Sequence, residues 1–302
     1  MIGLAVISIA LTGGGCKSPT LAERFEREAL AAWNDVEADL AHLQGEYTKT
    51  REVSRGQPFD GPAVVVRYAF AGRKTALFES RLVGSTELTS ADGYNDSYAF
   101  SVVAELGGAF RLRDFDSLSR PGDDDPASLR TALELQHTGR LLAAMQAWHI
   151  DLRQLFDPER RRDGFRIWIT GTRVSADSSR LWVEMQMQLD NYAGEPPKRA
   201  MMLIDSKLNW AVVHWESELY GCRRYVVNVD YQAAPSGGWM PRTIVETFRD
   251  NAGEIWQQID YQFGPPEVSR LTEEDTELEQ FGLSETDKPS TWEQLQRLDP
   301  VK

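Results

Sequence analysis

The sequence predicts an α+β fold that is mostly β: a strongly curved antiparallel sheet, an unclosed β-barrel of about 11–12 strands, with two helices covering its concave face. Three observations lead to this prediction. Many short segments alternate apolar and polar side chains, two longer segments repeat apolar side chains at helical spacing, and turn residues separate the short segments. The clearest alternation covers residues 181–189, where every odd position is apolar, which is typical of an antiparallel strand with one buried face.

The segments with a period of two lie on both sides of the second helical segment. Turn residues such as Asp92-Gly93, Ser236-Gly237-Gly238 and Asn251-Ala252-Gly253 separate them. Short strands at this spacing are typical of a barrel or a strongly curved sheet. The expected strands are 45–53, 64–70, 75–83, 98–104, 110–113, 165–174, 181–189, 199–204, 210–218, 223–231, 242–248 and 254–263.

The first helix is expected to begin after Thr20. Thr20 and Glu23 form the T-x-x-E pattern of a capping box, in which each residue satisfies a backbone amide of the other. Apolar side chains then recur at helical spacing as far as Leu43, and Gly45 ends the pattern.

A second, longer helix is expected over residues 125–157. Asp125-Pro126 provides an N-cap followed by a proline at the first helical position, and Asp157-Pro158 ends the segment. An apolar stripe runs from Leu129 to Leu155. A helix of about thirty residues is over ~40 Å long, so we expect it to lie across the concave face of the sheet. Because two helices cover such a sheet incompletely, we also expect a hollow beneath them.

Composition and charge exclude several classes of function. The net charge of −13 argues against nucleic-acid binding, which needs a basic surface. Two cysteines exclude a disulfide-rich scaffold and a four-cysteine zinc site. No apolar stretch reaches the roughly 18 residues needed to span a bilayer. The four histidines do not pair at metal-binding spacing, and no catalytic motif is found. We therefore expect no enzymatic activity, no catalytic residue, no metal and no cofactor.

The N-terminus resembles a bacterial lipoprotein signal. Residues 2–11 form an uncharged apolar run, small residues follow, and Cys16 comes next, which indicates export with cleavage before Cys16. The resemblance implies that Cys16 carries the lipid and becomes the first residue of the mature chain. An ordinary cleaved signal peptide and a buried N-terminal strand remain alternatives.

The role expected for the second cysteine, Cys222, depends on whether Cys16 is acylated. If Cys16 is acylated, Cys222 has no partner in the chain, and we expect a packed or half-buried thiol rather than a nucleophile. A Cys16–Cys222 disulfide is the alternative.

The candidate ligand site is inferred from composition. Met185, Met187, Met201 and Met202 lie on adjacent expected strands. Met145 would face them from the long helix together with Leu141 and Trp148. Unbranched methionine suits a surface that adapts to variable apolar ligands, but it also fills irregular gaps in ordinary cores. His137, between Leu133 and Leu141 in the helical stripe, is expected to be a hydrogen-bonded core histidine rather than a metal ligand.

The C-terminal segment differs from the rest of the chain. Pro265-Pro266 ends the last strand, and an acidic tail follows that we expect to be mostly solvated. Leu278, Phe281 and Leu283 are candidates for local docking, and residues 290–298 for a short helix. The expected organisation is a signal peptide at 1–15, a curved-sheet domain at 16–264 and an acidic tail at 265–302.

The order of these elements resembles the LolA/LolB lipoprotein-localisation superfamily. The similarity includes the lipobox-like start, the G-E-Y that follows the first helix, the two meanders around a mid-chain helix, and the ending F-G-L-S-E at 281–285. It covers residues 16 to about 287 and implies an unclosed barrel whose helix-covered concave face binds acyl chains or another apolar group.

The function that this resemblance implies is that of a lipid-anchored, periplasm-facing envelope protein. It would bind a lipid, an acyl chain or another apolar ligand and take part in lipoprotein or lipid transfer. Its partners would be the membrane, through the anchor, and an apolar ligand or lipoprotein acyl chain, and we expect a monomer. Lys17 after the cysteine favours the outer membrane. An envelope sensor that binds a partner protein is the alternative, and a hydrolase is a third.

Overall fold

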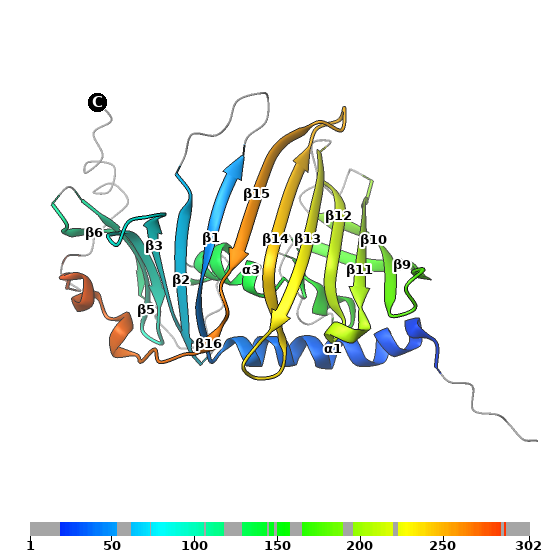
Figure 1. Cartoon of the computed structure of the whole chain (residues 1–302), viewed down its shortest axis with the longest axis horizontal. Coiled ribbons are helices and arrows are strands. Elements are labelled where there is room, and N and C mark those ends of the chain that lie inside the picture. The colour runs from blue at the N-terminus through cyan, green and yellow to red at the C-terminus, as the bar shows by residue number, and fades with distance from the viewer. Residues whose placement is uncertain are drawn as a thin grey trace, which may run out of the picture.

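One strongly curved antiparallel sheet forms the body of the protein (Figure 1). The computed structural model describes residues 19–52, 62–72, 74–105, 107–117, 129–143, 145–147, 150–157, 165–189, 196–219, 223–284 and 287. The sheet has fourteen strands in the order β6-β5-β4-β3-β2-β1-β15-β14-β13-β12-β11-β10-β9, with β16 beside β1. Strands β6 and β9 end this order and are not paired with each other, so the barrel is unclosed, as expected from the sequence.

The sheet consists of a first meander, β1–β6, and a second meander, β9–β15. The two meet where β1 pairs with β15. Their bounds are β1 Leu43–Glu52, β2 Val64–Ala71, β3 Thr75–Leu82, β4 Leu88–Tyr94, β5 Tyr98–Ala104, β6 Phe110–Ser117, β9 Phe165–Val174, β10 Arg180–Leu189, β11 Lys198–Asp205, β12 Ala211–Leu219, β13 Arg223–Ala233, β14 Trp239–Arg249, β15 Ile255–Phe263 and β16 Glu267–Val268. All twelve expected strands are present within a few residues of their predicted bounds.

The predicted turn at Asp92-Gly93 is wrong, because both residues lie inside β4. Gly93 pairs with Phe100 of β5. A Cβ at position 93 would lie 2.6 Å from Cζ of the Phe100 ring, closer than two carbons can approach. The glycine is therefore explained by the ring packed against the strand, and it does not mark a reversal of the chain.

Helix α1, Leu21–Leu40, has the predicted N-terminus. Thr20 and Glu23 form both hydrogen bonds of the capping box, and the buried side of the helix runs from Phe25 to Leu40. The apolar pattern that the sequence extends to Leu43 enters strand β1 instead. The Trp33 indole Nε1 donates a hydrogen bond of 3.0 Å to the Trp210 carbonyl, which fixes the helix to the turn before β12.

The predicted helix over 125–157 is much shorter in the structure. The described helical segment covers Leu129 to Leu141, as α2 Leu129–Leu133, a π-helical turn Glu134–Thr138, and α3 Gly139–Leu141. A two-stranded hairpin, β7 Gln146–Ala147 and β8 Ile150–Asp151, and a 3₁₀ turn Leu152–Leu155 follow. The hairpin and turn bury Met145, Ile150 and Leu152 as fully as a helix would. The spacing of apolar residues alone therefore does not distinguish a continuous helix from a short helix followed by a hairpin and a 3₁₀ turn.

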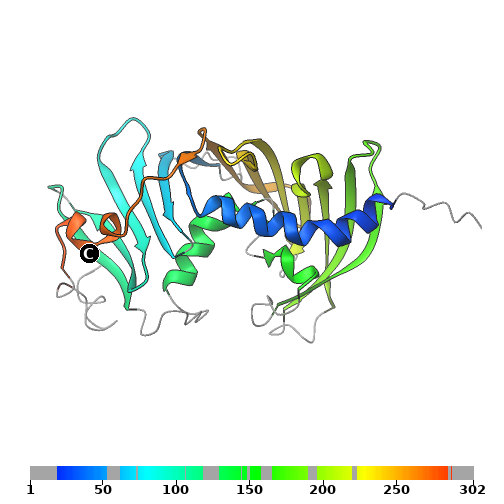
Figure 2. The same cartoon turned by 90° about the horizontal axis from the view of Figure 1, so that it is seen from below.

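The two helical elements lie on the concave side of the sheet, as predicted (Figure 2). One core cluster joins residues of α1 and of the 129–141 segment to the inward-facing side chains of strands β1–β3 and β9–β15. Arg153, in the 3₁₀ turn, forms ion pairs of 2.6 Å with Glu37 of α1 and with Asp151. The connection after the second helical segment is thereby attached to the first helix.

The chain after β15 docks on the outer face of the first meander. Leu278 and Phe281, on the 3₁₀ turn Leu278–Phe281, join a second cluster with alternate side chains of β4, β5 and β6. Leu283 packs at its edge, so the three docking candidates expected from the sequence all contact this cluster. A preceding 3₁₀ turn, Glu274–Thr276, buries Thr276 completely.

Candidate functional site

The concave face contains most of the predicted ligand-binding residues. Five of them are each at most 1% exposed and belong to one core cluster: Met185 and Met187 on β10, Met202 on β11, Leu141 at the end of the helical segment, and Met145 just after it. Met201, the neighbour of Met202, lies on the outer side of β11, as the alternation of a strand requires. The structure therefore places five of the predicted residues together in an interior that is closed to solvent.

The helical segment is held over this face by a hydrogen bond with β4. His137, in the π-helical turn, stacks on Phe78 of β3 with ring centroids 4.4 Å apart, and its Nε2 lies 2.8 Å from Asp92 Oδ2. His137 is 4% exposed, so the expectation of a hydrogen-bonded core histidine is confirmed. π-Helical turns are frequent at functional sites because they interrupt the regular hydrogen-bond ladder.

A charged cluster lies further along the same face. Arg140 of α3 places Nε 3.1 Å from Glu246 Oε1 on β14, and the Arg140 guanidinium lies 5.7 Å from the centroid of the Tyr261 ring on β15. The Arg140 and Glu246 side chains are 20% and 5% exposed. Tyr261 donates a 3.5 Å hydrogen bond to Glu246 Oε2. The Arg140–Glu246 pair is thus another polar contact between the helical segment and the sheet, beside those of His137 with Asp92 and of the Leu129 amide with Asp116.

Burial and the Arg140–Glu246 pair shift the pKa values of this cluster. Burial raises the pKa of Tyr261 to about 12, and the Glu246 carboxylate adds to that shift. The pKa of Tyr225 on β13 is also raised, first by burial and then by Glu246. Burial alone would lower the pKa of Arg140, but the Glu246 carboxylate holds it above its ordinary value. Both tyrosines are therefore neutral at physiological pH, and Arg140 stays charged.

Lys49 adds a second cation beside this cluster. It is half-buried on β1, pairs in register with Tyr261, and places Nζ 5.9 Å from the centroid of the Tyr261 ring. Burial lowers the pKa of Lys49, and the nearby Arg140 lowers it further. Sequence reasoning missed this residue, although a lysine two positions after the inward-facing Tyr47 is a detectable break in an apolar strand face.

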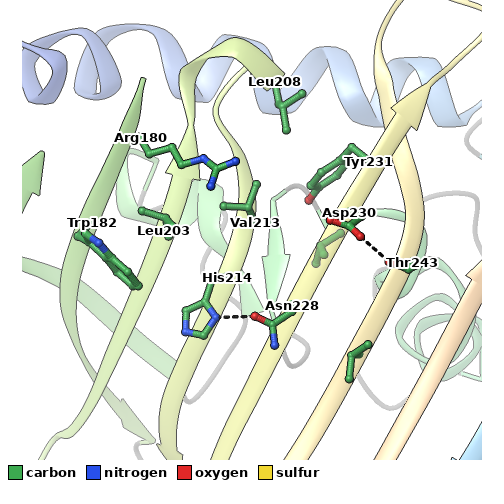
Figure 3. A pocket seen from close by; sticks show the side chains of 12 residues that line it. Arg180, Trp182, Leu203, Leu208, Val213, His214, Asn228, Asp230, Tyr231 and Thr243 are labelled. Carbon is green, nitrogen blue, oxygen red and sulfur yellow. Dashed lines mark hydrogen bonds between the residues drawn. The ribbon is translucent and has the colours of Figure 1, made fainter. Parts of the chain in front are cut away.

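The outer face carries a separate groove of about 480 Å³ over strands β10–β14. Figure 3 shows Trp182, Leu203 and Val213 lining it, with the His214 ring beside Asn228. His214 Nδ1 lies 2.8 Å from Asn228 Oδ1, and the Trp182 and His214 rings are 5.7 Å apart in an edge-on arrangement. Unlike the outer face of the first meander, this face is not covered by any part of the chain that the structure describes.

Several predicted features lie outside the described residues. They are Cys16, Trp148, Cys222, the Asp125-Pro126 helix start and the helix expected at 290–298. Within the described ranges, no group of three or more histidine, cysteine, aspartate or glutamate side chains is arranged to hold a metal ion. In those ranges no helix is both long and apolar enough to cross a membrane.

Comparison with protein-family models finds no match, and comparison with curated protein sequences finds none either. Comparison with solved structures finds similarities at low sequence identity. A putative outer membrane lipoprotein-sorting protein domain from Vibrio parahaemolyticus is 6% identical with a TM-score of 0.47, over 85% of this chain and all of that one. A LolA superfamily protein from Nitrosomonas europaea is 10% identical with a TM-score of 0.45, over 83% and 97%.

A DUF1329 family protein from Desulfovibrio piger is 8% identical with a TM-score of 0.48, over 85% of this chain and 98% of that one. The class that the geometry itself defines is an unclosed antiparallel half-barrel with an apolar concave face covered by helices.

Proposed function

We propose that this protein binds an apolar ligand, a lipid or an acyl chain, on the concave face of its half-barrel. The observation that carries the proposal is the extent of that face. Its apolar side chains run from β2 and β3 to β10 and β11, and only α1, the 129–141 segment and the short hairpin with its 3₁₀ turn cover them in the described structure. An extended apolar face under few covering elements suits a ligand that is itself long and apolar.

Binding on this face requires the helical segment to move. The methionines are closed to solvent in this state, so a ligand reaches them only when the covering element is displaced. The polar contacts that hold the segment include His137–Asp92, Arg140–Glu246 and the Leu129 amide with Asp116, and the segment contains a π-helical turn. A short covering element with a π-helical turn suits opening on the microsecond-to-second scale of lids. We therefore assign residues 129–141 the role of a lid.

A fluorescent acyl probe tests this proposal. The wild-type protein should bind it with micromolar or better affinity, and native mass spectrometry after gentle extraction should detect a co-purifying acyl ligand. Met185→Glu together with Met187→Glu should abolish binding, because it places charges on the apolar face. Met201→Glu is the matched control, since it alters the outer side of β11. Circular dichroism and the unfolding midpoint verify that each variant is folded. If the wild type binds no probe and carries no ligand, the proposal is wrong.

The site of action that we propose is the cell envelope. The support is the N-terminal sequence, an apolar run followed by Gly-Gly-Gly-Cys, which resembles a lipoprotein signal. The protein would be a monomer anchored through Cys16 and facing the periplasm, at the outer membrane rather than the inner one. Participation in lipoprotein or lipid transfer and the absence of enzymatic activity belong to the same proposal.

A second candidate function, binding of a partner protein, is favoured by the outer groove. Trp182, Leu203 and Val213 are presented there on a face that the described chain leaves uncovered. Large aromatic side chains in a groove are the usual anchors of protein interfaces. If this candidate is correct, Trp182→Ala should weaken partner binding and leave acyl-probe affinity unchanged. Equal partner binding by the wild type and this variant would exclude the groove as the interface.

A further inference from the structure

The charged cluster on the concave face is unbalanced. Two cations, Lys49 and Arg140, lie within 6 Å of the Tyr261 ring, and Glu246 is the carboxylate that pairs with Arg140. In the part of the chain that the structure describes, the Lys49 ammonium forms neither an ion pair nor a hydrogen bond. The cluster therefore carries a net positive charge, within a chain whose net charge is −13.

A cation in this position costs stability unless something compensates it. Lys49 is half-buried near Arg140, and burial and this like charge lower its pKa more than the nearby Glu246 carboxylate raises it. Lysine is rarely buried unless it is paired. An anion supplied by a ligand would provide the missing partner, and such charge-assisted hydrogen bonds are among the stronger ones in proteins.

We propose that the ligand of the concave face is an amphiphile with an anionic head group, a carboxylate or a phosphate, which binds Lys49 and Arg140. This inference rests on the function proposed above and specifies its ligand class. The apolar chain of the ligand extends from this cluster toward Met202 on β11 and Met185 on β10. Five strand spacings separate β1 from β11, which is about 24 Å along the sheet. An extended long-chain acyl group has a comparable length.

The test compares two forms of one fluorescent acyl probe, the free acid and its methyl ester. The wild type should bind the acid roughly tenfold or more tightly than the ester, since a charge-assisted hydrogen bond is made only by the acid. Lys49→Met should bring the ratio of the two affinities close to one. Lys74→Met is the matched control: Lys74 is an exposed lysine paired with Asp96, and this variant should keep the wild-type ratio.

Displacement of the acid probe separates the two sources of the anion. A fatty acid or a monoacyl phosphate of equal chain length should displace the probe, and whichever acts at lower concentration has the preferred head group. Inorganic phosphate alone should not displace it, because it has no chain for the apolar face. Displacement by inorganic phosphate at the concentration of the acyl compounds would overturn the proposal.

The outcomes distinguish this inference from the function on which it rests. Equal binding of acid and ester by the wild type, or a Lys49→Met variant that retains the preference for the acid, overturns the anionic head group and leaves apolar-chain binding in place. Failure of both probes to bind overturns the proposed function itself.

Discussion

Trp210 adopts a backbone conformation that bulky residues rarely take. Its φ angle is +61°, directly after Asn209 at +54°, in the turn between the 3₁₀ segment Ser206–Leu208 and β12. A β-carbon is disfavoured in this left-handed region, so surrounding contacts must hold the turn. The Trp33 hydrogen bond to the Trp210 carbonyl and the packing of Phe25 against the Trp210 ring, with centroids 5.8 Å apart, provide those contacts.

Trp33→Phe should therefore destabilise the protein. The substitution keeps an aromatic ring but leaves the buried Trp210 carbonyl without its donor, at a cost of about 1–3 kcal/mol in the free energy of unfolding. Urea denaturation measures the change. Trp182→Phe, on the outer face, is the control and should cost less than about 1 kcal/mol. Equal stability of Trp33→Phe and the wild type would show that the hydrogen bond does not hold the turn.

Lys49→Met should have the opposite effect and stabilise the protein at neutral pH. Burial lowers the folded-state pKa of Lys49 below its ordinary value of 10.5, so the charged form is disfavoured by folding. Below the pKa of the folded state, Lys49 is protonated in both the folded and the unfolded protein, and folding carries the full cost of desolvating the charge. As pH rises from the folded pKa to the unfolded one, the folded state loses its proton and the penalty disappears.

The stability advantage of Lys49→Met over the wild type is thus expected to be largest near pH 7 and to shrink as the pH approaches 10.5. Unfolding midpoints measured across this range check the sign. An advantage that grows with pH, or a variant less stable than the wild type at pH 7, would contradict the desolvation of Lys49.

At the scale of elements, the segment at 129–141 depends on a buried contact with the sheet. Leu141 and Met145 are at most 1% exposed, so Leu141→Asp and Met145→Asp each place an unpaired carboxylate in the core. Each should lower the free energy of unfolding by about 3–5 kcal/mol. Gln136→Asp, at an exposed position of the same segment, should cost less than about 1 kcal/mol. If all three variants are equally stable, the segment is not docked on the sheet.

The C-terminal segment is a second element whose docking is testable. Leu278 is completely buried against the outer face of the first meander, and its amide donates a 3.3 Å hydrogen bond to the Tyr98 hydroxyl. Leu278→Ala should destabilise the protein by about 2–5 kcal/mol and increase amide hydrogen exchange in β4–β6. The exposed neighbour Glu279 gives the control, Glu279→Ala. Unchanged exchange in both variants would mean that the segment does not stabilise these strands.

At the scale of the whole molecule, the expected lipid anchor determines where the protein is found. Cys16→Ser removes the side chain to which the proposed anchor would be attached, so the protein should move from the membrane fraction to the soluble periplasmic fraction. One acyl chain gives only marginal membrane affinity, so the anchor of the wild type should contain at least two. Fractionation and intact mass measurement test both points. A variant that stays in the membrane fraction would contradict the anchor.

The positions of the strands along the chain follow closely from local sequence. A β-strand has a side-chain period of two, and this period is visible wherever one face is buried, so the twelve expected segments appear as strands. The N-terminus of α1 is equally local, because the capping box needs only Thr20 and Glu23. Docking of Leu278 and Phe281 was also predictable, since apolar side chains in an acidic segment need a surface to cover.

The remaining features depend on contacts between distant parts of the chain. Residues 142–156 contain no glycine or proline, so nothing local marks the end of the helix after Leu141, and the hairpin forms because it buries Met145 and Leu152 on the sheet. Gly93 is a residue type typical of turns, yet it lies inside a strand. The reason is that the ring of Phe100 occupies the space that a side chain at position 93 would fill.

The charged cluster is the clearest example of a feature that local sequence does not predict. Lys49, Arg140 and Glu246 are separated by about a hundred residues each in the sequence and come together only when β1, α3 and β14 are assembled. Periodicity along the chain reports which side of an element is buried, because burial is decided by neighbours a few residues away. It does not report which charges meet on that buried side, because that depends on the order of strands in the sheet and on the helix that crosses it.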